Sequence, residues 1–466
     1  MMALNLRRIQ KSLFERHRFG LVLGLLFCAF ILPQQSTVEA ANKLRVVVGG
    51  GSTKSYAIAI PDFLGAGKQP TALSKRVTKV LRNDFKLSTV FKVINPISYQ
   101  ESASKNGIDP GTFDFAPWNN VKAQVVLKGR VIETGGGVKI QYRLYEVGSK
   151  QKVLSEDFVL SASQRRALRW YTHIISEKIY RKLATEKGIF TSKIVCVRIL
   201  GTSQELWYMD FDGSNARKLT NNGSINALPA WSPGGQYIAY TSWKNRNPDL
   251  YVLDRITGRA RKVSRYRGLN SGAAWSPDGK QIAFSASKGR ANMDIYVMNA
   301  NGSGLRQLTR AKSWERNLSP SWSPDGKQIT FVSNRYTHPQ IFVMNADGSN
   351  QRQLTTQGKY NQAPKWSPRG EWILFTGRDE KARFDIFKVS AKTKTIKRLT
   401  QGRGSNTEAA WSPNGRSIVF TSTRSGVPKL FIMGSEGERT KDEIARQITF
   451  LSGTFQTPSW SPSFYR

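Results

Sequence analysis

The chain has few cysteines and histidines, and this scarcity excludes several kinds of site. Its 466 residues include two cysteines, Cys28 and Cys196, and three histidines, His17, His173 and His338. Because Cys28 lies in a segment expected to be removed, Cys196 is left without a partner for an intramolecular disulfide. Zinc sites and Cys/His catalytic pairs need clustered ligands, which so few residues do not supply. We therefore expect no metal and no cofactor.

The chain also has no Gly-x-Ser-x-Gly motif, the turn that carries the nucleophile in α/β-hydrolases. This absence is informative because serine peptidases capped by a propeller carry Trp-Ser-Pro-Asp-Gly segments, and this chain carries them too. Those peptidases also need an Asp and a His downstream of the serine. The sequence therefore predicts a protein that is not an enzyme.

Acidic residues are scarce relative to basic ones. The chain has 71 Lys and Arg against 32 Asp and Glu, for a formal net charge of +39. Attraction to a polyanion or to an acidic protein face is one interpretation, and a solvated basic surface is the other. Since the basic residues are scattered over every repeat and form no run interleaved with aromatics, we expect no nucleic-acid binding.

Long apolar runs are also lacking, except for one near the N-terminus. Five basic residues precede the 14-residue apolar run 19–32, and small residues flank Glu39. This pattern predicts a signal peptide over residues 1–40, cleaved after Ala40, and a periplasmic protein. A membrane anchor is disfavoured because the run is short for a bilayer span, and a lipid anchor on Cys28 because bulky Phe27 precedes it. The signal holds five basic and two acidic residues, so its removal lowers the charge only to +36.

Residues 41–192 read as an α/β domain of ordinary size. Apolar residues at helical spacing predict helices over about 71–85 and 163–184, and β-rich runs predict strands over 44–48, 56–60, 123–132, 138–147 and 152–160. The run Gly49-Gly50-Gly51 lacks the spacing of a phosphate loop and reads as a flexible break. His173, in the second helix, reads as a structural histidine with no catalytic partner nearby in the sequence.

Residues 193–466 carry a repeat of about 45 residues. Trp-Ser-Pro recurs at intervals of 44, 47, 44, 45 and 49 residues, at Trp231, Trp275, Trp322, Trp366, Trp411 and Trp460. Four β-rich segments follow one another in each repeat, which is the pattern of a propeller blade. The last copy supplies an inner strand without the three strands that follow the other copies. Segments 194–197, 205–209 and 216–220, which precede the first copy, match those three strands. We therefore expect six blades, one of them shared by both ends of the domain.

Aspartates in the repeated turn could serve as calcium ligands. Asp278 and Asp325 follow two copies of Trp-Ser-Pro, but Gly234, Arg369 and Asn414 stand at the same place in others, and the next residue is glycine each time. Retention of the glycine rather than the carboxylate indicates a hairpin turn. We expect no metal there.

An asparagine precedes each Trp by five residues in five repeats. The column is Asn226, Asn270, Asn317, Asn361 and Asn406, with Phe455 in the shared blade. Asparagine can close a local turn on its own backbone, which is the structural interpretation. The alternative is a polar ring at one mouth of the central channel that receives a partner, with neighbours such as Leu318, Gln362, Thr407 and Glu408 setting its specificity.

Taken together, these segments resemble the TolB family of the Tol-Pal envelope system. The signal peptide, the α/β domain, the segments Arg169–His173 and Lys187–Phe190, the six Trp-Ser-Pro copies and the ending at Trp460 follow that family's order. The resemblance implies a scaffold that binds the peptidoglycan-associated lipoprotein Pal through the propeller mouth and TolA through its N-terminal segment. The residues matching that segment are Leu44, Arg45, Val46, Val47 and Val48. At the mouth, Leu269 and Leu318 stand where the family pattern has His and Thr.

The resemblance further implies a role in outer-membrane integrity and in constriction during cell division. We expect a monomer without a membrane span once the signal is cleaved, partnered by a Pal-like lipoprotein and a TolA-like protein. An extracytoplasmic propeller that binds a glycan or a peptide is the alternative function, because a channel mouth accommodates either.

Overall fold

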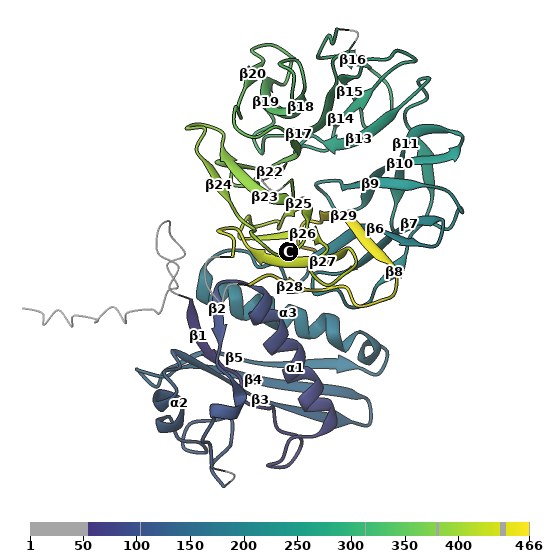
Figure 1. The fold of residues 1–466 in the computed structure, drawn as a ribbon. Coiled ribbons are helices and arrows are strands. Elements are labelled where there is room, and N and C mark those ends of the chain that lie inside the picture. The colour runs from purple at the N-terminus through teal and green to yellow at the C-terminus, as the bar shows by residue number, and fades with distance from the viewer. Residues whose placement is uncertain (1–54, 103, 313, 379–381, 439–443, 466) are drawn as a thin grey trace, which may run out of the picture. The chain divides into compact units, whose positions relative to one another are not determined.

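The structure is a computed structural model that describes residues 55–466 apart from 103, 313, 379–381, 439–443 and 466. The expected signal peptide over residues 1–40 and the expected strand over 44–48 lie outside the described residues. The described part begins with a mixed α/β region and continues into six four-stranded sheets (Figure 1). None of the described helices is long and apolar enough to cross a membrane.

The α/β region is built on a five-stranded sheet with the order β2-β1-β3-β4-β5. Its strands are β1 (Tyr56–Ala59), β2 (Phe91–Val93), β3 (Val125–Thr134), β4 (Gly137–Glu146) and β5 (Lys152–Ser161). Strand β1 runs parallel to β2 and β3, whereas β3, β4 and β5 are antiparallel neighbours. Gly137 closes the β3–β4 hairpin with φ +156°, where a Cβ would lie 1.9 Å from the carbonyl oxygen of Leu160.

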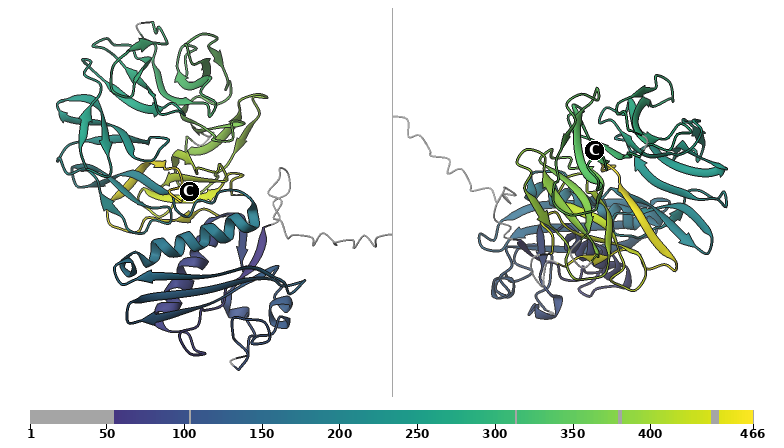
Figure 2. Two further views of the ribbon diagram at one scale, coloured as in Figure 1. Left: turned by 180° about the vertical axis from the view of Figure 1, so that it is seen from behind. Right: turned by 45° about the horizontal axis from the view of Figure 1, so that its top comes forward.

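Helices cover both faces of this sheet. They are α1 (Ala72–Leu87), α2 (Ala116–Asn120) and α3 (Leu168–Ala184), with short 3-10 turns η1 (Pro96–Ser98) and η2 (Gln164–Ala167). Thr71 and Ser74 form a capping box that starts α1. Apolar residues of α1 and α3 share one core with one face of the sheet, while Trp118 of α2 packs on the other (Figures 1 and 2). The two long helices were predicted; α2 and the three-residue β2 were not.

Five of the six remaining sheets are continuous in sequence. The first contains β9 (Asn226–Trp231), β10 (Tyr237–Asn245), β11 (Asn247–Asp254) and β12 (Ala260–Lys262), and the second contains β13 (Asn270–Trp275), β14 (Gln281–Ala286), β15 (Asp294–Asn299) and β16 (Arg306–Gln307). The third contains β17 (Asn317–Trp322), β18 (Gln328–Ser333), β19 (Gln340–Asn345) and β20 (Arg352–Gln353). The fourth contains β21 (Asn361–Trp366), β22 (Trp372–Arg378), β23 (Phe384–Ser390) and β24 (Ile396–Arg398), and the fifth contains β25 (Asn406–Trp411), β26 (Ser417–Ser422), β27 (Lys429–Gly434) and β28 (Arg446–Gln447).

The sixth sheet joins segments that are far apart in sequence. It has the order β29-β6-β7-β8, with β29 (Thr454–Trp460) antiparallel to β6 (Lys193–Leu200), followed by β7 (Ser203–Asp210) and β8 (Arg217–Lys218). Figure 1 shows β29, in yellow, beside β6. Each first strand contacts the first strands of the neighbouring sheets, and β29 contacts both β25 and β9. The fold is therefore a six-bladed β-propeller after a small α/β region, as the repeat predicted.

The repeated Trp-Ser-Pro segment connects neighbouring blades. The indole nitrogens of Trp275, Trp322 and Trp411 donate to the carbonyls of Ala230, Ala274 and Lys365 in the preceding blade, over 2.9–3.2 Å. In the turn that follows, Asp278 Oδ1 accepts from Ser276 Oγ at 2.6 Å and from the N–H of Lys280 at 3.0 Å. The aspartate thus closes the hairpin, which is the turn role that the glycine column indicated.

Candidate functional site

The asparagine column starts the inner strand of five blades, and its side chains are buried. Each of the five is at most 3% exposed. In the fifth blade Asn406 Nδ2 donates to Asp385 Oδ1 at 2.8 Å, and its Oδ1 accepts from Ser422 Oγ at 2.7 Å. In the fourth, Asn361 Nδ2 donates to Gln340 Oε1 at 2.7 Å. These bonds tie the inner strand to the third strand of the preceding blade, and Ser422 ties it to the second strand of its own. Burial and hydrogen bonding therefore favour the structural interpretation of the asparagine amides.

The residues beside the asparagines keep part of their surface accessible. Leu269, Leu318, Gln362, Thr407 and Glu408 are all half-buried. The backbone of Leu269 is fixed by Ser287, whose Oγ accepts from the Leu269 N–H at 3.1 Å. Leu318 packs at the edge of the apolar cluster that contains Val332 and Ile341. A partner at this end of the propeller would therefore contact these half-buried residues. The buried asparagines would hold the loops in place.

Two residues after each asparagine, the inner strand bulges. All six inner strands carry a residue with positive φ there, and each shows a register shift. The residues are Leu228 (51°), Gly272 (67°), Ser319 (54°), Ala363 (52°), Glu408 (54°) and Thr457 (50°). Left-handed backbone at a residue other than glycine costs on the order of 1 kcal/mol and persists only where its surroundings enforce it. Such bulges re-aim side chains, and Gly272 is the one of the six whose residue type favours this conformation.

One of these bulged residues, Glu408, belongs to a charged pair on neighbouring inner strands. Its Oε2 accepts from the N–H of Thr457 at 2.8 Å, and its own N–H donates to Thr376 Oγ1 at 3.0 Å. Burial raises the pKa of Glu408, opposed by the Thr457 N–H and by Lys365. Burial likewise lowers the pKa of Lys365, opposed by Glu408. Glu408, predicted as a mouth residue, thus also joins β25 to β29 and to β22.

A second group of charged side chains gathers around His173 on α3. Its Nδ1 lies 2.8 Å from Asp84 Oδ2 on α1, and its Nε2 lies 3.9 Å from Asp212 Oδ2 and 4.0 Å from Asp210 Oδ2, which belong to the β7–β8 connection and the end of β7. All four side chains are buried. Burial alone would lower the pKa of His173, but Asp84, Asp212 and Asp210 outweigh it and raise the pKa. An imidazolium is therefore favoured at this place.

Each of the three carboxylates around His173 has a cationic partner, which is His173 itself for Asp84. Arg169 pairs with Asp212, and Lys193 pairs with Asp210. Burial raises the pKa of Asp84, whereas for Asp212 the nearby His173 and Arg169 outweigh burial and lower the pKa. Asp84, His173 and Asp212 present ligand atoms within 4.8 Å of one another, a donor set that zinc accepts. Because the carboxylates are already engaged by cations, we interpret the group as an ion network that holds α1, α3 and the sixth blade together.

Sequence reasoning placed His173 in the correct helix but found no acidic partner for it. The partners come from α1 and from the β7–β8 connection, and no local spacing links them. The only available signal was the pattern Asp210-Phe211-Asp212, which reads as an ordinary turn.

Known protein families match both parts of the chain. The TolB amino-terminal domain matches residues 44–153, and the TolB beta propeller domain matches residues 180–389 and 379–464. The Tol-Pal system protein TolB of Myxococcus xanthus (strain DK1622) is 42% identical over 443 residues, which cover 95% of this chain and 98% of that relative. The protein of the same description from Anaeromyxobacter dehalogenans (strain 2CP-C) is 37% identical over 286 residues, which cover 61% of this chain and 64% of the relative.

A solved structure supports the fold. The crystal structure of TolB from Acinetobacter baumannii superposes with a TM-score of 0.73 at 24% sequence identity and covers 88% of this chain and 97% of that chain. Fold, domain matches and near-complete alignment with the Myxococcus relative agree with the resemblance drawn from the repeats. The chain therefore belongs to the TolB family of Tol-Pal system proteins.

Proposed function

We propose that the chain is a periplasmic scaffold that binds a Pal-like peptidoglycan-associated lipoprotein at the asparagine end of the propeller. The observation that supports this most is the near full-length similarity to a Tol-Pal system protein TolB. The half-buried neighbours of the asparagine column, Leu269, Leu318, Gln362, Thr407 and Glu408, are the proposed contacts. They lie at the starts of the inner strands, beside the connecting loops, and binding residues are often presented at such places on a rigid scaffold.

We further propose that Leu44, Arg45, Val46, Val47 and Val48 bind a TolA-like protein. Removal of residues 1–40 would leave this segment near the new N-terminus. Its three consecutive valines, Val46, Val47 and Val48, suit an extended strand that adds to the edge of a partner's sheet through its backbone. With two partners of this kind, the chain would act without catalysis, as a connection across the envelope that supports outer-membrane integrity and constriction.

The mouth assignment is tested by introducing one charge at either end of the propeller. Gln362, beside Asn361 at the start of β21, is changed to Lys, and Gln281, at the Trp end of β14, is changed to Lys as the matched control; both are half-buried. Pull-down from outer-membrane extract should recover a Pal-like lipoprotein with the unaltered chain and with Gln281→Lys, and much less with Gln362→Lys. Equal recovery with both variants would contradict the mouth assignment, and recovery of glycan fragments alone would contradict the scaffold function.

The TolA assignment is tested by deleting residues 41–48. The deletion should abolish binding to purified TolA-like protein while leaving recovery of the Pal-like lipoprotein intact or higher. Loss of both interactions would show that the two sites are not separate.

A further inference from the structure

In four blades a cation lies over an aromatic pair formed by the second and third strands. The cations are Lys244, Lys288, Arg335 and Arg424, with 4.0–5.7 Å between the charge centre and the nearest ring centroids. The two lysines lie over the third-strand ring, and the two arginines lie over both rings. Part of the chain's high basic content thus serves the blades themselves, since a cation over aromatic faces is stabilising.

Arg335 and Arg424 occupy the same position in the third and fifth blades. Arg335 Nε donates to Ser333 Oγ at 2.9 Å and Nη2 donates to Asn317 Oδ1 at 3.2 Å. Arg424 repeats both bonds with the serine and asparagine of its own blade, at 3.0 and 3.1 Å. Because fold and local contacts are shared, any difference between the two guanidinium groups reflects their remaining partner.

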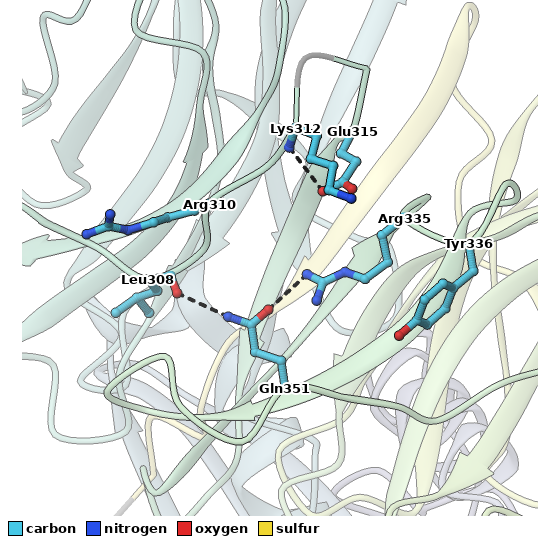
Figure 3. Close-up of a pocket in the computed structure, with 7 residues that line it drawn as sticks. All are labelled: Leu308, Arg310, Lys312, Glu315, Arg335, Tyr336 and Gln351. Carbon is cyan, nitrogen blue, oxygen red and sulfur yellow. Dashed lines mark hydrogen bonds between the residues drawn. The ribbon is translucent and has the colours of Figure 1, made fainter.

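That partner is a carboxylate in the fifth blade and an amide in the third. Arg424 Nη1 and Nη2 donate to Glu438 Oε1 and Oε2 at 2.6 and 3.2 Å, a paired contact between guanidinium and carboxylate. Arg335 Nη2 instead donates to Gln351 Oε1 at 2.9 Å, and Gln351 Nε2 donates to the carbonyl of Leu308 (Figure 3). Among the residues that the structure describes, no carboxylate oxygen lies within 4.0 Å of the Arg335 guanidinium nitrogens.

The two acids that act electrostatically on Arg335 are hydrogen-bonded to other groups. Glu315 is buried and its Oε2 accepts from the N–H of Lys312 at 3.1 Å. Asp294 is buried beneath the loop and accepts from Thr309 Oγ1 at 2.7 Å and from the N–H of Ala311 at 2.8 Å. Burial lowers the pKa of Arg335, and Glu315 and Asp294 oppose this only from a distance. The guanidinium therefore keeps a charge that its own blade does not neutralise by contact.

Arg335 lines a cavity of about 500 Å³ between the second and third blades. The other lining residues shown in Figure 3 are Leu308, Arg310, Lys312, Glu315, Tyr336 and Gln351. Arg310 and Lys312 are exposed, so the cavity carries three cations against one carboxylate. Two large aromatic side chains are exposed on the same loops, Tyr336 at 64% and Trp314 at 53%. Exposed aromatic residues beside arginine are frequent at the energetic centres of protein interfaces.

We propose that this cavity binds an acidic side chain from an extended segment of a partner protein. The carboxylate would take the place beside Arg335 that Glu438 takes beside Arg424, with Arg310 and Lys312 around it and apolar parts of the segment against Tyr336 and Trp314. A carboxylate is favoured as the ligand because the equivalent guanidinium in this same chain binds one. This site contains none of the mouth residues proposed above, so it goes beyond the proposed function.

The test measures binding of a fluorescein-labelled octaglutamate peptide to the full chain at about 0.15 M salt, where exposed charges are screened beyond about 8 Å. Arg335→Gln should weaken binding about tenfold, since a charge-assisted bidentate contact is lost. Arg424→Gln is the matched control: it removes the same charge from the same position in another blade and should change the affinity by less than about twofold. Equal weakening in both variants would overturn the proposal, because it would mark a general effect of net charge.

A second variant supplies the carboxylate from within the chain. Gln351→Glu places an acid next to Arg335, in the manner of Glu438 beside Arg424, and should also weaken peptide binding about tenfold. Circular dichroism confirms that each variant remains folded. Unchanged peptide affinity in folded Gln351→Glu would refute the site. Binding to phosphatidylglycerol vesicles that depends on Arg335, with no such dependence for the peptide, would also refute it in favour of a lipid surface.

Discussion

Replacing His173 by Ala should destabilise the protein strongly, because it leaves a buried carboxylate without its cation. Asp84 is fully buried and accepts from His173 Nδ1 at 2.8 Å and from Ser176 Oγ at 2.6 Å. Without the imidazolium, only the serine hydroxyl stabilises that charge. Removal of one partner from a buried ion pair costs about 3–5 kcal/mol. For roughly 400 residues that unfold as one cooperative unit, this corresponds to a drop of about 3–6 °C in the midpoint of thermal unfolding.

The cost should depend on pH in a defined direction. Asp84, Asp212 and Asp210 raise the pKa of His173 above its ordinary value of about 6.5, against the effect of burial. A group whose pKa is higher in the folded state contributes its full stabilisation below the unfolded pKa and loses it as the pH rises through the folded pKa. The difference between the unaltered chain and His173→Ala should therefore be largest near pH 6 and shrink toward alkaline pH.

Calorimetric unfolding from about pH 6 to about pH 9 measures this difference. His338→Ala, which removes an exposed histidine elsewhere, is the control and should shift the midpoint by less than about 1 °C. The paired replacement His173→Leu with Asp84→Leu should cost less than the sum of the single changes, because no buried charge is then left alone. A cost below about 1 kcal/mol for His173→Ala, or a cost independent of pH, would refute the ion network.

Two further changes test how the propeller is held together. Deleting residues 457–466 removes most of β29, including Trp460, whose indole donates to Ser192 Oγ at 2.7 Å. This deletion should lower the melting temperature of the whole propeller. An unchanged melting temperature would contradict the closing role of β29. Glu438→Gln leaves Arg424 without its carboxylate and should lower the free energy of unfolding by about 1.5–3 kcal/mol in chemical denaturation. Glu371→Gln, the same change at an exposed residue, is the control and should shift it by less than about 0.5 kcal/mol.

Much of the fold followed from the sequence because its determinants are local and repeated. Trp231 and its five counterparts recur at nearly constant spacing, and the glycine after each turn fixes a hairpin. Helix α1 was located by the period of Leu73, Val77, Val80 and Leu81. Strand β2 was missed because three residues carry no detectable period, and α2 because Pro117 and Asn119 are poor helix formers outside a first turn.

The candidate sites followed from the sequence less well, because their geometry arises from contacts between distant segments. Leu228, Ser319 and Glu408 adopt the left-handed conformation within the inner strands of the ring. None of these residue types favours positive φ, so the sequence does not predict it. The partners of His173 lie on other elements. The difference between Arg335 and Arg424 depends on whether Gln351 or Glu438 reaches the guanidinium, which only the folded blades reveal.

Because β29 pairs with β6, the sixth blade is completed only when the last strand of the propeller has been made. Strand β6 is the first propeller strand made, and its inner neighbour β29 is the last, so five blades can form while one edge of β6 stays open. Contacts between such distant segments form slowly, because a long chain must be closed before they are gained. An open edge strand invites pairing with other chains. The time between synthesis of Lys193 and of Trp460 is therefore the interval in which this protein is most exposed to misassembly, and slowing the production of its final residues should increase aggregation.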